Sequence, residues 1–278
     1  MAKSSKRRPN NTGSSAKKQL QQTLAHANAQ SNPLATLPSA FQSVTIAQKH
    51  DTAGSDGAPS QTNGTIHYYK SPLPESILQQ CLDLFERNMG EMYKKSEWGL
   101  DMEEKRRELL HEDARFLIII LEDASSDTAD NDAADADDNE TTTAAAATDS
   151  STDDIIKNTT SPKPSPQQQE VIGFAHFRYE PDEDSPLSPI TYLYELQISL
   201  TSNGLGKTLM TLIELLSLQL HMTKVTLTVF KCNTGAMKFY LDKLKGYDVD
   251  ECSPSNFEGG DDVEYEILSK KIGNSRRV

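Results

Sequence analysis

The feature of this sequence that most limits its fold is a run of alternating strand and helix patterns in its C-terminal half. Residues 190–199 alternate as a strand does, a turn with Gly204 and Gly206 follows, and a strongly apolar helix is predicted at about 205–221. A strand at 225–230, a helix at 233–244 and strands at 247–251 and 263–269 complete the series. The run therefore predicts a sheet with a helix inserted between its strands.

The preceding part of the chain adds helices first and strands afterwards. Apolar spacing predicts a helix at 75–93, a short charged helix at about 101–111, and strands at 116–121 and 171–179. A turn rich in proline and aspartate is expected at 180–189. Taken together, the order predicts an α/β fold with a mixed central sheet flanked by helices.

A strongly acidic segment interrupts these patterns at about 122–170. It holds 13 acidic and 2 basic residues among Asp, Ala, Thr and Ser, and ends in several prolines. Such a composition cannot bury enough apolar area to offset the entropy lost on ordering. We expect a disordered loop between two neighbouring strands, because loop closure costs little more as length grows.

The N-terminal 50 residues have the opposite charge, with 7 basic and no acidic residues. The basic cluster at 3–18 suits either a solvated tail or a nuclear address. A helix is predicted at 16–30, followed by a polar linker. The expected division is a mostly disordered basic tail at 1–64, a domain at 65–271 interrupted by the acidic loop, and a C-terminal tail at 272–278.

Composition excludes several classes of protein. The formal net charge of −13 disfavours direct nucleic-acid binding and favours cationic peptides as partners. Three scattered cysteines are too few for a disulfide framework or a zinc site, so we expect a reduced intracellular compartment and no metal. The longest aliphatic run, Leu117 to Leu121, is too short to span a membrane, and no signal peptide is recognised.

The turn at 204–207 is the clearest candidate for phosphate binding, because it joins a strand to a helix start. Amides there lack intrahelical partners, Lys207 adds charge, and glycine permits close approach of the backbone to a pyrophosphate. A P-loop requires a glycine where Thr201 stands, so that motif is incomplete. An ordinary strand-to-helix turn and a coenzyme A (CoA) turn both remain open on this evidence.

Several motifs in order indicate a family. At 92–99, 175–178 and 194–197, and again at 204–207, 227–231, 253–255 and 265–269, the chain resembles the N-terminal acetyltransferase D family of the GNAT superfamily, which acetylates histones H4 and H2A. The resemblance covers about 75–121 and 171–271. It implies a GNAT fold, acetyl-CoA as cosubstrate, and histone H4 and H2A tails as substrates. One departure is Thr201, Ser202 and Asn203, where the family usually has basic residues; fewer cationic contacts to CoA are implied.

The resemblance also assigns catalytic roles. Glu195 is the expected general base, acting directly or through a water, although its spacing alone favours a surface or salt-bridged glutamate. Tyr194 and Tyr93 would orient the substrate amine. Taken singly, each tyrosine suits packing as well as binding.

For the cofactor and the substrate, the resemblance implies two further sets. The residues expected to contact CoA are Leu196, Gln197, Ile198, Gly204, Leu205, Gly206, Lys207, Thr208, Asn233 and Tyr240. Asn233 also suits a helix N-cap, and Tyr240 suits packing. The residues expected to contact the peptide are Trp98, Glu180, Asp182, Tyr192 and Tyr265. Glu180 and Asp182 would bind an arginine side chain, whereas His176 is expected to be a hydrogen-bonded core residue.

The remaining expectations concern the whole molecule. We expect an acetyltransferase in the nucleus and cytoplasm, a monomer, with no nucleic acid or membrane as partner. The alternatives are a GNAT enzyme for lysine or small amines, and a non-catalytic module that holds histone tails on its acidic surface.

Overall fold

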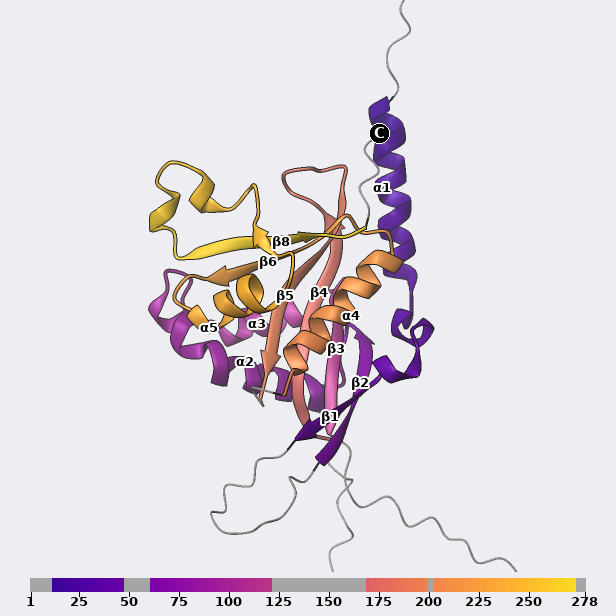
Figure 1. The fold of residues 1–278 in the computed structure, drawn as a ribbon, viewed down its shortest axis with the longest axis vertical. Coiled ribbons are helices and arrows are strands. Elements are labelled where there is room, and N and C mark those ends of the chain that lie inside the picture. Colours follow the sequence, from indigo (N-terminus) through magenta and orange to yellow (C-terminus); the bar gives the residue numbers. More distant parts are fainter. Residues whose placement is uncertain (1–11, 48–60, 122–168, 200–202, 274–278) are drawn as a thin grey trace, which may run out of the picture. The chain divides into compact units, whose positions relative to one another are not determined.

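The computed structural model describes residues 12–47, 61–121, 169–199 and 203–273, which form one eight-stranded sheet with helices on both faces (Figure 1). The strand order is β1-β2-β3-β4-β5-β6-β8-β7, and β5 and β6 are the parallel pair. The other neighbouring pairs are antiparallel. The strands are β1 (Ser43–Ala47), β2 (Gln61–Lys70), β3 (Arg115–Leu121), β4 (Val171–Pro181), β5 (Pro189–Ile198), β6 (Lys224–Phe230), β7 (Asp248–Val249) and β8 (Tyr265–Lys271).

One face of the sheet is covered by α1 (Thr12–Ala29) and α4 (Leu205–Gln219), which lie beside each other in Figure 1. In α4, Leu205, Leu209, Leu212 and Leu216 recur at a spacing of three or four and pack on this face. The short α5 (Thr234–Lys238) continues into a π-helical turn, η3 (Phe239–Lys243), whose Tyr240 joins the same core.

The opposite face is covered by α2 (Glu75–Lys95) and α3 (Met102–Leu109). β3 lies between the two cores: Phe116 and Ile118 point to the α2 side, whereas Leu117 and Ile119 point to the α4 side. From Phe116 onward β3 packs against a core on each face, and this explains the uninterrupted apolar run in the sequence.

The predicted α/β fold with a mixed central sheet is confirmed, and most predicted elements lie within a few residues of their expected bounds. The polar linker expected before residue 65 is wrong as a secondary-structure prediction, since β1 and the start of β2 lie in it and pair with each other. Short 3-10 helices, η1 (Pro33–Thr36) and η2 (Ser39–Phe41), precede β1. The strand expected at 247–251 shrinks to the two-residue β7, and η4 (Pro254–Asn256) and η5 (Gly260–Asp262) fill the loop before β8.

Some predictions fall outside the described residues. They are the basic cluster before residue 12, nearly all of the acidic loop at 122–170, Thr201 and Ser202, and the C-terminal residues after 273. The helices and strands described above all lie within residues 1–122 and 170–278. The ends of the acidic segment meet in the sheet, since Leu121 N donates to Glu170 O at 3.0 Å.

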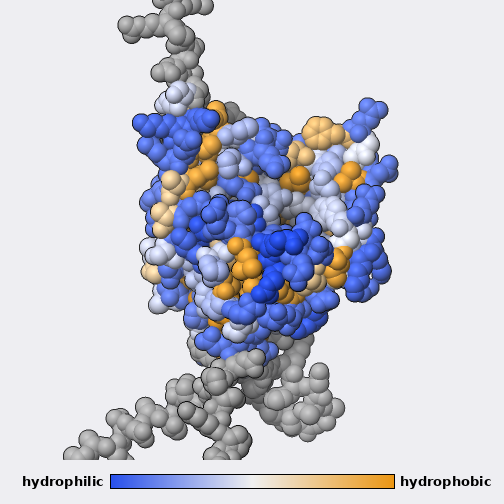
Figure 2. All heavy atoms as spheres, turned by 180° about the vertical axis from the view of Figure 1, so that it is seen from behind, coloured by the Kyte–Doolittle hydropathy of each residue, from blue (hydrophilic) through white to orange (hydrophobic). Residues whose placement is uncertain are grey.

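Hydrophilic side chains dominate the face turned away from the view in Figure 1, and apolar side chains show there only in small separate patches (Figure 2). Within the described part of the chain, no helix has both the length and the apolar character that crossing a bilayer requires. None of the three cysteines forms a disulfide.

Candidate active site

A cavity opens where the two parallel strands separate. Ile190 to Leu193 of β5 pair with Lys224 to Leu227 of β6, and the strands then continue to Ile198 and Phe230, over described residues that no longer pair with each other. The separation leaves a cavity of about 230 Å³, hereafter the first cavity. Its walls come from β5, β6, α2, α3, α5 and η3, so residues far apart in sequence meet there.

A bulge in β5 turns two consecutive side chains into this cavity. His176 of β4 is opposite Glu195, but the next residue, Phe177, is opposite Leu193, which leaves Tyr194 as the extra residue. In a regular strand, Tyr194 and Glu195 would point to opposite faces of the sheet. Because of the bulge, both line the first cavity.

Glu195 is almost fully buried at the wall of the first cavity, where polar groups surround its carboxylate. Lys105 Nζ lies 2.7 Å from its Oε1, and Gln197 Nε2 donates to its Oε2 at 2.8 Å. Burial raises the pKa of Glu195, and the charge of Glu108 raises it further, whereas Lys105 and Gln197 lower it without restoring the usual value. Glu195 is therefore a carboxylate that accepts a proton more readily than an exposed glutamate.

Lys105 and Glu108 are site residues that the sequence prediction missed. Asp101 caps α3 by accepting from Glu103 N and Glu104 N, which sets the helix phase. Met102, Lys105 and Leu109 then share one helix face. A lysine in this otherwise apolar stripe was the available signal for a buried partner. Lys105 Nζ bonds both oxygens of Glu108 at 3.1 and 3.0 Å.

His176 is a core residue, as expected, but the expected hydrogen bonds are wrong. Its ring is fully buried between Phe116 and Tyr194, and neither ring nitrogen has a hydrogen-bond partner. Glu108 Oε1 lies 3.5 Å from Nδ1. Burial lowers the pKa of His176 to about 4, against the opposing effect of Glu108, so the ring is neutral at pH 7.

Both predicted catalytic tyrosines line the first cavity. The Tyr194 hydroxyl donates to Glu180 Oε2 at 3.1 Å, and Arg178 lies 4.2 Å from the centre of its ring. Tyr93 packs edge-on against Phe230, with 5.2 Å between ring centres. Burial raises the pKa of both phenols, so each stays protonated and can donate a hydrogen bond at neutral pH.

The residues predicted to contact CoA divide into two groups. Leu196, Gln197, Asn233 and Tyr240 line the first cavity. Ile198 and the residues of the helix start, Gly204, Leu205, Gly206, Lys207 and Thr208, do not line it. Asn233 is an N-cap, as expected, because its side chain accepts from Ala236 N of α5, and its contact with CoA stays a prediction.

The two glycines at the start of α4 are required for different structural reasons. Gly204 has φ +74°, and a Cβ there would meet nothing within 4 Å. Its conformation demands glycine, and the space beside it is open. A Cβ on Gly206 would lie 3.2 Å from the Phe239 ring, so Gly206 permits helix packing, where the sequence analysis assigned it to pyrophosphate approach.

A second cavity of about 250 Å³ adjoins the first and shares Tyr192 and Tyr194 with it. Four acidic residues at the end of β4 and in the turn before β5 line it: Glu180, Asp182, Glu183 and Asp184. The Thr226 hydroxyl is buried in its wall without a hydrogen-bond partner. Of the other predicted peptide contacts, Trp98 lines the first cavity and is 51% exposed, and Tyr265 does not line it but lies 5.3 Å from the Trp98 ring.

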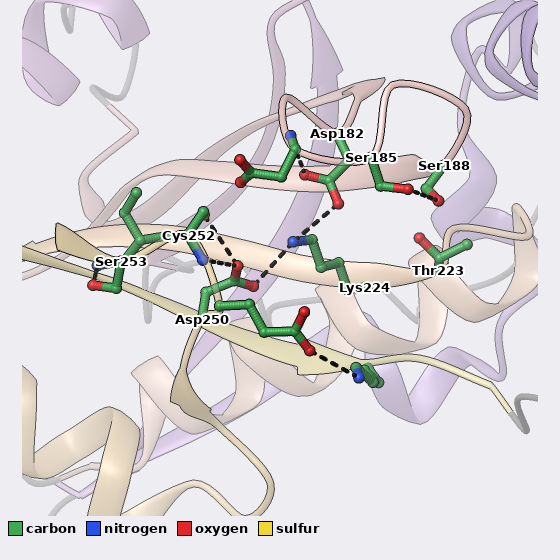
Figure 3. Close-up of polar contacts among 12 residues, drawn as sticks. Asp182, Ser185, Ser188, Thr223, Lys224, Asp250, Cys252 and Ser253 are labelled. Carbon is green, nitrogen blue, oxygen red and sulfur yellow. Dashed lines mark hydrogen bonds and ion pairs between the residues drawn. The ribbon is translucent and has the colours of Figure 1, made fainter. Parts of the chain in front are cut away.

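Asp182, predicted to bind a substrate arginine, already forms an ion pair inside the protein. Lys224 Nζ lies 3.0 Å from Asp182 Oδ2 and 2.9 Å from Asp250 Oδ2, as Figure 3 shows. This pair forms one wall of a third cavity, of about 750 Å³. Asp182 therefore neutralises a lysine of the protein itself, which leaves Glu180 and Glu183 as the better candidates for a substrate cation.

Among the described residues, one group is close enough to share a metal ion: Asp184, Asp250 and Cys252. Asp250 already accepts hydrogen bonds from Lys224 Nζ and from Cys252 N and Sγ. The lysine ammonium thus supplies the positive charge at this position, and the expectation of no metal stays a prediction.

The sequence comparison adds the family. Residues 147–247 match the model of the acetyltransferase (GNAT) family. Over these residues the chain is similar to that family. The mixed, mostly antiparallel sheet flanked by helices described above is the GNAT fold.

Solved structures with a similar fold include three that each cover 75% of this chain. Arabidopsis thaliana NAA60 with a bisubstrate analogue is 13% identical, covered over 100% of its own length, with a TM-score of 0.44. An acetyltransferase of Staphylococcus aureus Mu50 is 10% identical over 100% of its length, with a TM-score of 0.43. The NatC complex bound to Gag peptide and CoA is 12% identical, covered over 99% of its own length, with a TM-score of 0.41. At these identities, structural likeness says nothing about the substrate.

Proposed function

We propose that this GNAT protein is an N-terminal acetyltransferase, which transfers acetyl from acetyl-CoA to the α-amine of a protein whose first residues are small and then basic. Histones H4 and H2A are the proposed substrates. The observation that carries the proposal is the pair of adjoining cavities. A buried carboxylate and two phenols line the first, acidic side chains line the second, and Tyr192 and Tyr194 form their shared wall.

The chemistry requires a neutral amine. A free α-amine has a pKa of about 7.7–8.0, so one proton must be removed near neutral pH. Glu195 takes that proton, directly or through a water, and becomes a neutral carboxylic acid. The amine nitrogen then forms a bond to the acetyl carbon and releases its second proton to solvent, the carbon–sulfur bond breaks, and the CoA thiolate leaves and takes up a proton.

Tyr240 lines the first cavity and suits stabilisation of the departing sulfur. Burial raises its pKa, and the charge of Glu195 adds to this effect. A phenol with a raised pKa is a weaker acid than a thiol, so complete proton transfer from Tyr240 is unfavourable. We therefore assign Tyr240 a hydrogen bond to the developing thiolate, with the proton coming from solvent.

Two features fit acetyl-CoA. The unpaired edges of β5 and β6 beyond Leu193 and Leu227 offer backbone groups to an extended chain such as pantetheine. The first amides of α4 lack helical acceptors and suit a pyrophosphate, and the space beside Gly204 is open. Lys207 supplies a positive charge at the same helix end.

Substrate preference follows from the second cavity. A cationic side chain a short distance along the peptide from the reacting amine would lie beside Glu180 and Glu183, and the unpartnered Thr226 hydroxyl offers a hydrogen bond. A neutral peptide leaves these carboxylates without a partner.

For the molecule as a whole, we propose a monomer that is located in the nucleus and cytoplasm and binds neither nucleic acid nor membranes.

Mass spectrometry of a histone H4 N-terminal peptide incubated with the protein and acetyl-CoA tests this proposal. We expect one acetyl group, on the α-amine. A matched peptide with a blocked N-terminus controls for lysine, because a lysine acetyltransferase would still modify it. Acetylation of lysine alone, or no product from either peptide, would reject the proposal.

The alternative of a non-catalytic histone-binding module depends on the acidic segment. Because Leu121 and Glu170 are hydrogen-bonded neighbours, a short hairpin turn can replace 123–169 without separating β3 from β4. The enzyme proposal expects turnover of short peptides to stay near that of the full chain. Loss of histone association, with no turnover by either protein, would favour the module.

A further inference from the structure

Lys105 occupies a position that the proposed reaction does not yet explain. Its side chain is 8% exposed, and its Nζ lies 2.7 Å from Glu195 and 3.0 Å from Glu108. The ammonium also lies over two aromatic rings, 4.6 Å from the centre of Phe85 and 5.5 Å from that of Tyr93. A buried lysine costs free energy unless it is paired, and here two carboxylates and two rings surround it.

The contacts of Lys105 exclude a direct part in bond making. An ammonium group has three protons, and the three contacts of Nζ are Glu195 Oε1 and both oxygens of Glu108. No donor remains for an oxyanion of the substrate. Burial acts to lower the pKa of Lys105, but Glu195, Glu108 and Tyr93 raise it overall, so the group stays protonated.

We propose that Lys105 is the positioning residue for Glu195: its ammonium, anchored by Glu108, keeps the Glu195 carboxylate charged and holds it at the cavity wall. This inference rests on Glu195 being the base of the proposed function. Gln197 holds the second oxygen of the carboxylate and is itself held by Asn88 Nδ2 at 3.0 Å. Both carboxylate oxygens are therefore fixed, each by a different element.

The groups that face Glu195 explain why a cation is needed. Glu108 of α3 is a second carboxylate and disfavours ionisation of Glu195. Tyr93 of α2 and Tyr240 of η3 are protonated phenols, and His176 of β4 is a neutral ring. Among the described groups facing Glu195, Lys105 is the cation, so its removal would leave a buried carboxylate beside another one.

The first test compares Lys105→Met with Lys105→Arg in the full chain. The readout is the pH dependence of kcat/KM on a free-amine H4 peptide. We expect Lys105→Met to move the acidic limb upward by about one pH unit or more, because the lost ion pair is worth at least that shift. Lys105→Arg should keep the limb near its original position. A loss of activity that is uniform across pH would overturn the proposal, since it would indicate a merely structural role.

Glu108→Gln supplies a result of opposite sign. This variant removes the like charge and keeps Lys105, so the limb should move downward. A general loss of folding cannot produce shifts in opposite directions. Lys94→Met is the matched control, because its ion pair with Glu91 is exposed, at 54% and 76%, and its limb should not move.

A second readout needs no enzyme activity. Carboxyl-labelled glutamate in the protein gives one carbon NMR signal for Glu195, identified by its absence in Glu195→Gln. We expect the pH at which this signal changes from carboxylate to carboxylic acid to be higher in Lys105→Met than in the original protein. If the original protein shows no acetyl transfer, the proposed function fails while this titration still decides the role of Lys105. An unchanged Glu195 signal in Lys105→Met would overturn the inference.

Discussion

Two regions of the molecule contain the same arrangement, one lysine between two carboxylates, with different consequences. Lys105 lies between Glu195 and Glu108, and Lys224 lies between Asp182 and Asp250. The two lysine side chains are similarly shielded, 8% and 13% exposed. Burial of the lysine and ion-pair distance therefore do not distinguish the two regions.

The pKa values of the carboxylates do distinguish them. Burial acts to raise the pKa of Asp250, but hydrogen bonds from Ser269, Cys252 and Lys224 outweigh it and lower the pKa well below its usual value. Burial also raises the pKa of Glu195, and there Lys105 and Gln197 do not outweigh it. An ion pair with many donors fixes a carboxylate in its charged form, whereas one with few donors leaves it able to accept a proton.

Amide substitution should have its largest effect on catalysis at Glu195. Glu195→Gln keeps the shape and can still accept from Lys105, but it cannot take a proton. We expect turnover to fall on the order of 10²–10⁴-fold, as for loss of a positioned base. The measurement is initial rate on the H4 peptide, with CoA binding measured separately and expected to persist. The same substitution in the other region, Asp250→Asn, is the control; equal losses in both variants would break the comparison.

A smaller effect on catalysis is expected from Glu180→Gln in the second cavity. The amide can still accept from the Tyr194 hydroxyl but loses its charge toward a substrate cation. We expect kcat/KM for an arginine-containing peptide to fall about tenfold, equivalent to about 1.4 kcal/mol. The matched peptide has alanine in place of arginine, and Glu180→Gln should leave its kcat/KM nearly unchanged. An equal loss on both peptides would show that Glu180 does not recognise the cation.

The sequence predicts one of these regions better than the other. Apolar periodicity located most strands and helices, because buried faces impose a spacing on the chain. Glu195 and both tyrosines were identified through family motifs, and all three line the first cavity. Lys105 was missed because its partner lies 90 residues away in sequence, and only folding brings α3 against β5.

The second region shows the limit of aligning residues by motif. Asp182 resembles a substrate-binding carboxylate, but Lys224, which follows 42 residues later, already pairs with it.

β1 was missed in the sequence analysis for a different reason. Val44 and Ile46 alternate with Ser43 and Thr45 as in a half-buried strand, but this edge strand is short and stands in an otherwise polar stretch, so the pattern was overlooked.

Glu195→Gln should lower turnover more than Asp250→Asn does, but Asp250→Asn should lower stability more than Glu195→Gln does. Asp250→Asn removes the ion pair with Lys224 and weakens the contact with the Cys252 thiol. We expect the free energy of unfolding at pH 7 to fall by about 1–3 kcal/mol, with turnover per folded molecule unchanged. Chemical denaturation measures the first and the H4 peptide assay the second. A stable but inactive Asp250→Asn protein would place Asp250 in the catalytic machinery and contradict its structural role.

The finest distinction between the regions is the pH dependence of stability. The folded pKa of Asp250 lies below its unfolded value of about 3.9, so its stabilisation is present above that pH and is lost as the pH falls. The stability advantage over Asp250→Asn should shrink between pH 7 and pH 3.5 by up to about 0.7 kcal/mol, and by less where solvent screens the charge. The folded pKa of Glu195 lies above its unfolded value, so its contribution is present at low pH and is lost as the pH rises. The stability of the original protein relative to Glu195→Gln should therefore decline toward neutral pH. Denaturation curves of the original protein, Asp250→Asn and Glu195→Gln across this pH range give the stability difference of each variant as a function of pH. If both differences changed with pH in the same direction, the two lysines would hold their carboxylates in the same way.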